Sequence, residues 1–240
     1  MKELLSGIRA ELKRLGSAEE LAKTRRFHQP DEQVDGYGVR APEVQRMARE
    51  LYAQVKKWPA ADRDRLCETL WESGRHEEGA LAIYLYRRFA KQFGAREFRM
   101  FAGWLDRFVN DWSLTDGISQ WLLGGCIAND ASLIGDLDAW TRSKNRWKRR
   151  AAAVALEPSA SRGLHADAIF RIGTLLMTDE DVMVQKGVGW LLKETYPKKP
   201  RETMRFVLPW RESAPRLVLR YAAEKMTAAD KAKVMWRGGF

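Results

Sequence analysis

Helical segments rich in small residues such as Gly and Ala recur along the chain at a nearly constant spacing. GALAIYL at 79–85 is followed by DGISQWLL, RRAAAVAL and KGVGWLL. Trp112 precedes Trp147 by 35 residues, and aligning RRAAAVAL with QKGVGWLL places Lys186 36 residues after Arg150. A period of 35 to 40 residues with two helices per unit is typical of HEAT-like repeats, which stack into a curved superhelix. The repeat therefore predicts an all-α solenoid with a concave face.

Helix signals extend over the rest of the chain, whereas alternating β-branched runs with Asn-Gly turns, the mark of hairpins, do not occur. Ser17 and Glu20 form a capping-box pattern that opens the second helix. The segment 27–40, FHQPDEQVDGYGVR, is predicted to be the one long loop. Among about a dozen helices, nine are expected at approximately 42–56, 60–73, 77–93, 95–108, 112–128, 131–143, 145–157, 164–178 and 181–196.

The composition suits one cytoplasmic domain spanning residues 1–240. Of the 240 residues, 45% are hydrophobic, which is enough for one sizeable core. Two isolated cysteines, Cys67 and Cys126, cannot make a disulfide framework or a zinc site. His28, His76 and His165 lack the spacing that places two histidines on one helical face, so we expect no metal. No apolar run approaches the roughly 18 residues of a membrane span.

Positive charge is in excess. Lys and Arg number 42 against 32 Asp and Glu, which leaves a net charge of +10 and a pI near 9.7. A basic balance of this kind favours a polyanionic partner, so we expect the concave face to be basic.

One carboxylate departs from the repeat. The inner helices carry small residues that permit close packing between layers, at Gly79, Gly117, Ala151 and Gly187. Asp116 aligns with Ala151 and Gly187 in later repeats and with Leu81 in the earlier one. An unpaired buried charge costs several kcal/mol, so packing alone does not account for this side chain. It belongs to a functional site, or it bonds a neighbouring helix.

Three indoles accompany charged side chains on successive inner helices. The pairs are Trp112 with Asp116, Trp147 with Arg150, and Trp190 with Lys186. Residues three or four apart share a helical face, so we expect the three indoles to point to one side. Other tryptophans are expected to be core: Trp71, Trp121, Trp140 and Trp236.

A carboxylate flanked by indole faces is an environment for a cation. Cation–π contacts contribute about 0.5–2 kcal/mol each, and a carboxylate about 4 Å from a positive charge contributes about 4 kcal/mol at an effective dielectric of 20. Four cations are expected at the rim, where they would hold phosphates: Lys148, Arg149, Arg150 and Lys186. An alkylated purine nucleotide in DNA combines such a cation with a polyanion.

Five segments in order resemble the AlkD-like DNA alkylation repair glycosylases, which are built from HEAT-like repeats. They are YGVRAPEVQRMARE, NDWSLTDGIS, NRWKRRAAAVAL, VQKGVGWLLKE and SAPRLVLRYAAEKM. The resemblance implies that Asp116 is the catalytic carboxylate, that Trp112 and Trp190 contact the sugar, and that Arg150 grips DNA. Phe27 is the counterpart of an aromatic residue near the lesion, although the loop that follows it is longer here.

The implied activity is removal of cationic N3- or N7-alkylated purines from double-stranded DNA. A cationic base leaves without protonation, so one carboxylate suffices. No lysine has the placement of a Schiff-base nucleophile, which predicts a monofunctional enzyme that leaves an abasic site and needs no cofactor. The resemblance also implies catalysis without base flipping. A DNA-wrapping solenoid works as a monomer, with Trp147 among the DNA-binding residues.

Two other functions fit parts of the pattern. A non-catalytic HEAT-repeat module that binds nucleic acid would share the charge but not the chemistry. A protein–protein adaptor would have an apolar or acidic concave face instead of a basic one.

Overall fold

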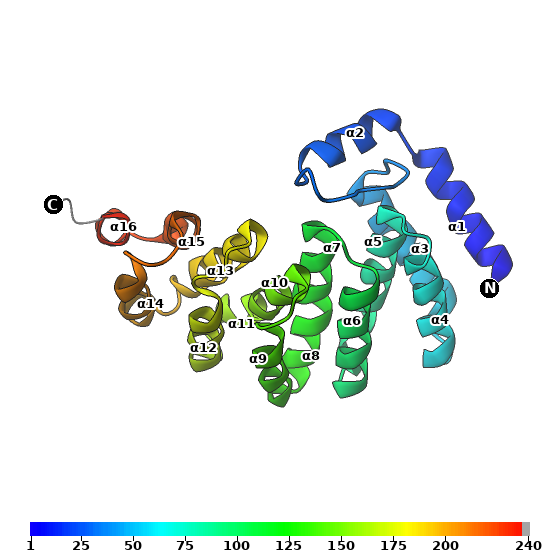
Figure 1. The fold of residues 1–240 in the computed structure, drawn as a ribbon. Coiled ribbons are helices and arrows are strands. Elements are labelled where there is room, and N and C mark those ends of the chain that lie inside the picture. Colours follow the sequence, from blue (N-terminus) through cyan, green and yellow to red (C-terminus); the bar gives the residue numbers. More distant parts are fainter. Residues whose placement is uncertain (237–240) are drawn as a thin grey trace.

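Helices stacked side by side along an arc make up the computed structural model of the chain, which describes residues 1–236 (Figure 1). These residues contain no β-strand, so the all-α prediction is confirmed. The α-helices are α1 (Lys2–Leu15), α2 (Ala18–Arg26), α3 (Ala41–Val55), α4 (Ala60–Trp71), α5 (His76–Tyr86), α6 (Ala95–Arg107), α7 (Trp112–Gly117), α8 (Gly124–Asn129), α9 (Leu137–Trp140), α10 (Arg146–Val154), α11 (Glu157–Ala160), α12 (Ala166–Leu176), α13 (Val182–Thr195), α14 (Pro200–Val207), α15 (Arg216–Ala222) and α16 (Ala228–Met235).

Shorter helical turns join several of these elements. A π-helix (Ile118–Leu123) connects α7 to α8, so that 112–129 is one continuous rod, close to the expected 112–128. Four further turns are 3₁₀ helices: Arg87–Gln92, Ala131–Asp136, Leu208–Trp210 and Ala223–Lys225. The helix expected at 131–143 is therefore a 3₁₀ turn followed by the short α9. No helix in the described residues is both long and apolar enough to cross a bilayer.

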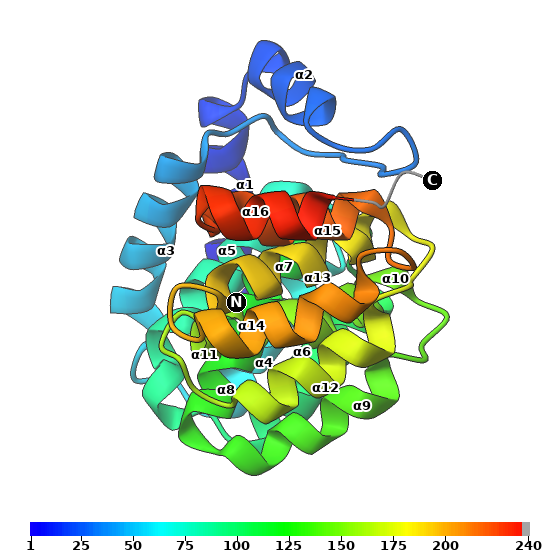
Figure 2. The ribbon, with the colours of Figure 1, turned by 90° about the vertical axis from the view of Figure 1, so that its left-hand side faces the viewer.

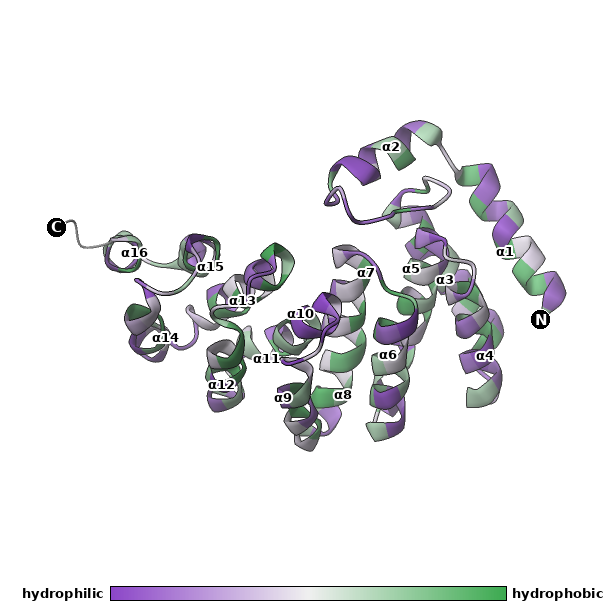
Figure 3. Ribbon diagram, in the orientation of Figure 1, coloured by the Kyte–Doolittle hydropathy of each residue, from purple (hydrophilic) through white to green (hydrophobic). Residues whose placement is uncertain are grey.

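The helices form two layers, as the repeat predicts. Along one layer α3, α5, α7, α10, α13 and α15 each pack against the next. The other layer, below them in Figure 1, holds α4, α6, α9, α12 and α14. Hydrophobic and hydrophilic residues share most helices, which is the amphipathic pattern of elements that bury one face (Figure 3). The chain thus has the architecture of HEAT-like helical repeats.

Buried apolar side chains form one contiguous cluster from Leu5 to Val234. Trp71 and Trp140 belong to it, as expected. Trp236 does not. Its side chain is 57% exposed, with the Arg211 guanidinium 5.1 Å from its ring, so its prediction as core is wrong. It directly follows α16, as the residue at which that helix ends.

The long loop at 27–40 is confirmed, and it leaves the end of α2 to cross the inner layer. Ser17 caps α2 by accepting the Glu20 amide at 3.4 Å. The buried Glu77 on α5 then fixes the loop, accepting the backbone amides of Tyr37 (2.9 Å), Gly38 (2.7 Å) and Val39 (3.0 Å). Figure 2 shows α2 and this loop standing beyond the rest of the stack. The loop is thereby held over the helices that carry the charged and aromatic residues.

Gly79 allows α5 to approach α4. A Cβ placed on it would lie 2.5 Å from Cζ3 of the buried Trp71, whereas a Cβ on Gly103 of α6 would meet nothing within 4 Å. We expect Gly79→Ala to lower the free energy of unfolding by about 1–3 kcal/mol through overpacking. Gly103→Ala should raise it by roughly 0.5–1 kcal/mol through helix propensity. Urea denaturation measures both, and equal effects of the two substitutions would contradict the close approach.

Candidate active site

A cleft of about 290 Å³ opens on the inner layer where α7, α10 and α13 meet the end of α2. Its walls are mainly aromatic and charged, and they comprise Phe27, Gln29, Trp112, Asp116, Arg150, Met183, Lys186, Trp190, Lys193 and Tyr221. Six of the nine site residues expected from the sequence line this one cleft. The solenoid therefore brings residues from 27 to 190 to one place.

Asp116 lines the cleft, one helical turn after Trp112. Both of its carboxylate oxygens accept hydrogen bonds from Arg150, one from Nε and one from Nη2, each at 2.8 Å. Arg150 also donates from Nη1 to the carbonyl of Met183 on α13. The Asp116 side chain keeps 11% of its surface exposed. The carboxylate thus does both things that the sequence left open, since it bonds the neighbouring helix and lines the cleft.

Burial controls the electrostatics of this pair. Loss of solvent raises the pKa of Asp116 above its ordinary value, Arg150 opposes that rise, and the negative charge of Asp111 adds to it. A buried ion pair is stable when its geometry is good and its remaining hydrogen-bonding atoms are satisfied, as the bidentate contact and the Met183 carbonyl provide here. The result is a negative charge in a fixed orientation.

The two indoles expected at the site lie on two different helices of the inner layer. Trp112 begins α7, and its Nε1–H donates to the Phe27 carbonyl at 3.2 Å. Trp190 lies on α13, with the Lys193 ammonium 6.0 Å from the centre of its ring. Both line the cleft together with Asp116. A carboxylate and two π faces therefore border the same space, an arrangement that suits a positively charged ligand.

Two further predicted residues face the same cleft. Phe27 ends α2, and 75% of its surface is exposed, an unusual state for a large apolar side chain. Lys186 on α13 has no ion-pair partner among the described side chains. An exposed aromatic ring and an unpaired cation are groups that a ligand can still engage.

Three predicted residues lie outside the cleft. Trp147 is 5% exposed, with the Arg146 guanidinium 4.4 Å over its ring, so the expectation that all three indoles point to one side is wrong. Residues three apart differ by about 60° around a helix, which separates Trp147 from Arg150. Lys148 pairs with Asp106 at 2.5 Å and Arg149 with Asp179 at 2.7 Å.

Arg150 itself is not a rim residue. Only 5% of its side chain is exposed, because the guanidinium points inward to Asp116 and the Met183 carbonyl. The expected rim position is wrong for this reason, and a phosphate contact by Arg150 stays a prediction.

The sequence matches the family described as DNA alkylation repair enzyme over residues 8–226. The chain belongs to this family. Its fold is also similar to three solved structures. A predicted DNA alkylation repair enzyme from Enterococcus faecalis has 19% identity and a TM-score of 0.78, with 89% of this chain and 97% of that one covered.

The other two structures come from Streptococcus mutans. AlkD2 has 17% identity and a TM-score of 0.62, with 88% of this chain and 99% of that one covered. The protein smu.31 has 18% identity and a TM-score of 0.60, with 78% and 92% covered. At these identities the likeness shows the fold alone. No protein with a curated description matches the sequence significantly.

Sequence reasoning missed a polar cluster behind Trp112 in this DNA alkylation repair enzyme. Asp111 caps α7 by accepting the amides of Ser113 (2.8 Å) and Leu114 (2.9 Å). His76 Nδ1 lies 3.3 Å from the other carboxylate oxygen, Oδ2, and His28 Nε2 lies 3.6 Å from the capping oxygen, Oδ1. The Asp before a helix start signalled the cap, but the histidines lie 35 and 83 positions earlier, where no local spacing reveals them. Among residues 1–236 no group of three or more candidate ligands is arranged to hold a metal ion.

The Asp116–Arg150 pair can be tested by a double-mutant cycle. Arg150→Met leaves a buried carboxylate without its partner, so we expect a loss of about 3–5 kcal/mol in the free energy of unfolding. The double variant with Asp116→Asn should lose less than the sum of the two single losses, because neither charge is then left unpaired. Arg171→Met removes an exposed pair with Asp138 and should cost about 0–1 kcal/mol. Additive losses at 116 and 150 would mean that the two side chains are not coupled.

Proposed function

We propose that this DNA alkylation repair enzyme is a monofunctional glycosylase. It hydrolyses the N-glycosidic bond of cationic N3- or N7-alkylated purines in double-stranded DNA and leaves an abasic site. The observation that supports this most is the Asp116 carboxylate, which Arg150 binds through both oxygens and which lines a cleft together with Trp112 and Trp190.

Asp116 acts on the sugar. Cleavage of the bond develops positive charge on the deoxyribose, and enzymes that cleave ordinary glycosides use a second carboxyl group to protonate the leaving group. An alkylated cationic purine leaves without that proton. One carboxylate then stabilises the oxocarbenium ion and positions the attacking water. Since Arg150 fixes Asp116 beforehand, little reorganisation is needed as the charge forms.

The indoles and the cations bind DNA. Trp112 and Trp190 pack on the deoxyribose, where each contributes about 0.5–2 kcal/mol as the sugar becomes positive. Phe27 lies beside them near the lesion. Lys186 holds a phosphate near the cleft. Arg150 would reach one only if its Nη1 gave up the Met183 carbonyl while the contact with Asp116 remained. Lys148 and Arg149 contribute from the start of α10, where they would exchange Asp106 and Asp179 for phosphates. Trp147 is buried and would act only by supporting that helix.

DNA lies across the cleft with the base still in the helix. The proposed groups all belong to one copy of the chain, which suits a monomer. We place this monomer in the cytoplasm and assign it no cofactor. Catalysis from the sugar side does not require a flipped base, in contrast to glycosylases that read the base in a closed pocket.

Base release is the direct test. A duplex containing 7-methylguanine should release the free base and keep its strand intact, and borohydride should trap no covalent adduct on Lys186 or Lys193. Asp116→Asn should slow release by about 10²–10⁴-fold while DNA affinity is retained. Asp138→Asn, which removes an exposed carboxylate paired with Arg171, should have no effect. Because burial raises the pKa of Asp116, release by the native enzyme should fall with decreasing pH at a higher pH than for an ordinary aspartate.

The alternatives give different results. Unchanged release by Asp116→Asn would remove this residue from the mechanism. A salt-sensitive shift of DNA without base release would instead favour a non-catalytic nucleic-acid-binding module.

Salt dependence tests the DNA-binding residues. The logarithm of the binding constant should fall with the logarithm of salt concentration by about 0.9 per phosphate contact. Lys186→Ala should reduce this slope by about one contact and weaken binding to all sequences alike. Lys233→Ala removes a cation of α16 that pairs with Asp230, and it should leave the slope unchanged. A slope unaffected at position 186 would place Lys186 away from the DNA backbone.

A further inference from the structure

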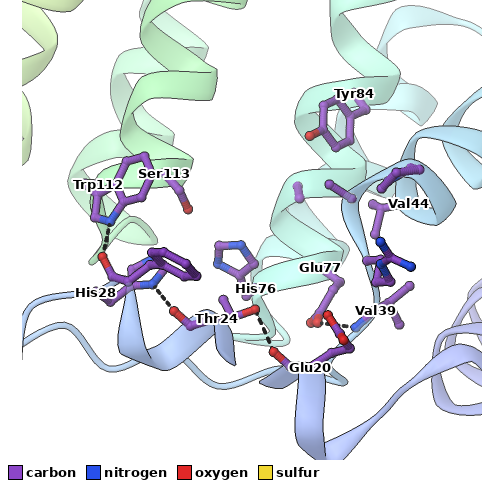
Figure 4. Close-up of a pocket in the computed structure, with 15 residues that line it drawn as sticks. Glu20, Thr24, His28, Val39, Val44, His76, Glu77, Tyr84, Trp112 and Ser113 are labelled. Atoms are coloured by element: carbon purple, nitrogen blue, oxygen red, sulfur yellow. Dashed lines mark hydrogen bonds between the residues drawn. The ribbon is translucent and has the colours of Figure 1, made fainter. Parts of the chain in front are cut away.

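A second cavity of about 440 Å³ shares Phe27 and Trp112 with the cleft. Figure 4 shows the residues that line it, with Trp112, His28 and His76 among them. His28 lies in its wall, with only 4% of its side chain exposed. The imidazole stacks on the Trp112 indole at a centroid separation of 5.5 Å and an angle of 29°. Trp112 is thus held from two directions, by the His28 ring and by the hydrogen bond of its Nε1–H to the Phe27 carbonyl.

Both nitrogens of His28 face hydrogen-bond acceptors. Nδ1 lies 2.8 Å from the Thr24 carbonyl, which can only accept, so Nδ1 carries a hydrogen. Nε2 is buried and faces an oxygen of Asp111 at 3.6 Å, with no other partner among the described residues. A neutral ring with its hydrogen on Nδ1 would direct the Nε2 lone pair at a carboxylate. The imidazolium ion, which donates from both nitrogens, fits this environment.

The other charges near His28 come from three elements. Glu32, in the same loop, is 6% exposed and adds negative charge. His76 on α5 meets the His28 ring edge-to-face at 5.9 Å and shares Asp111 with it. Arg146 at the start of α10 acts on Glu32 but already pairs with Asp31 at 2.6 Å. Two carboxylates therefore favour a positive charge on His28, and Arg146 is engaged with Asp31.

We propose that His28 is a positioning residue, which as an imidazolium ion ties the end of α2 to the start of α7 and so sets the orientation of Trp112. Asp111 is the receiving group, and it is also the cap of the helix that carries Trp112 and Asp116. Loss of the proton from His28 loosens the contact with Asp111 and releases the indole. The effect on base release rests on the proposed function, whereas the orientation of the indole does not.

The direction of the pH dependence follows from the contacts. Burial disfavours the charged ring, but the attraction of the Asp111 carboxylate and the hydrogen bond to the Thr24 carbonyl outweigh it and raise the pKa of His28 above its ordinary value of 6.5. The histidines in turn help to hold the pKa of Asp111 well below its usual range, so that this carboxylate stays ionised. The stabilisation of the folded protein by the charged His28 ring is therefore complete below pH 6.5, and it is lost as pH rises through the pKa of His28 in the folded state.

Nuclear magnetic resonance can follow both rings in the free protein. The chain has three histidines, so single substitutions assign each imidazole signal, and Trp112→Phe assigns the indole N–H signal. We expect His28 to titrate above pH 6.5 and the Trp112 indole signal to shift with the same midpoint. A His28 midpoint at or below 6.5, or an indole signal that does not follow it, would overturn the proposal.

Two variants separate the stacked ring from its charge. His28→Phe keeps a flat ring but lacks both N–H groups, and His28→Gln keeps a neutral donor. Both should abolish the pH-dependent shift of the Trp112 indole and slow base release about 10- to 10²-fold, the cost of a misplaced contact group. In the native enzyme release should fall as pH rises through the His28 midpoint, and in both variants that limb should be absent.

His165→Asn is the matched control. His165 lies at the start of α12 with φ 54°, a left-handed conformation that Asn adopts readily. Removing this histidine should alter neither the indole signal nor the pH profile. If every variant and the native chain fail to release base, the proposed function fails, and the two resonance titrations still decide the role of His28.

Discussion

The buried pair between Asp116 and Arg150 is the interaction on which the candidate site depends. It joins α7 to α10, and the Met183 carbonyl extends the contact to α13. Gly187 makes room for it, because a Cβ there would lie 3.2 Å from Cγ of Arg150. Three consecutive inner helices are thereby fixed around one carboxylate, whose charge is kept in low-dielectric surroundings where it acts strongly on a nearby cation.

The end of α2 and the loop at 27–40 complete the site that the repeats build in part. The helical stack supplies Asp116 and Trp190, but the end of α2 supplies Phe27 and the contacts that hold Trp112. Glu77 anchors the loop through three backbone amides, and Asp111 joins the cap of α7 to the histidines. The site is therefore formed by the helical repeats together with one long loop. Functional residues commonly lie on loops that a rigid scaffold holds in position.

Polar contacts across the stack often join residues about one repeat apart. His76 and Asp111 are 35 positions apart, and Asp116 and Arg150 are 34 apart. A solenoid makes such residues neighbours, since each unit packs only on the next. The repeat alone could thus have suggested a contact between 116 and 150. It could not show that both oxygens are bound, that the guanidinium points inward, or that Trp147 is buried behind Arg146.

The sequence by itself determined the all-α class, most of the helices, their stacking period, the loop at 27–40 and the unusual position of Asp116 between indoles. These features follow from local rules, because helical periodicity and chain spacing are properties of neighbouring residues. The tertiary structure decided which side chains meet. It turned Arg150 inward, paired Lys148 and Arg149 with carboxylates outside the cleft, and brought His28 to Asp111 across 83 positions. Side-chain direction depends on packing between distant segments, which no local pattern encodes.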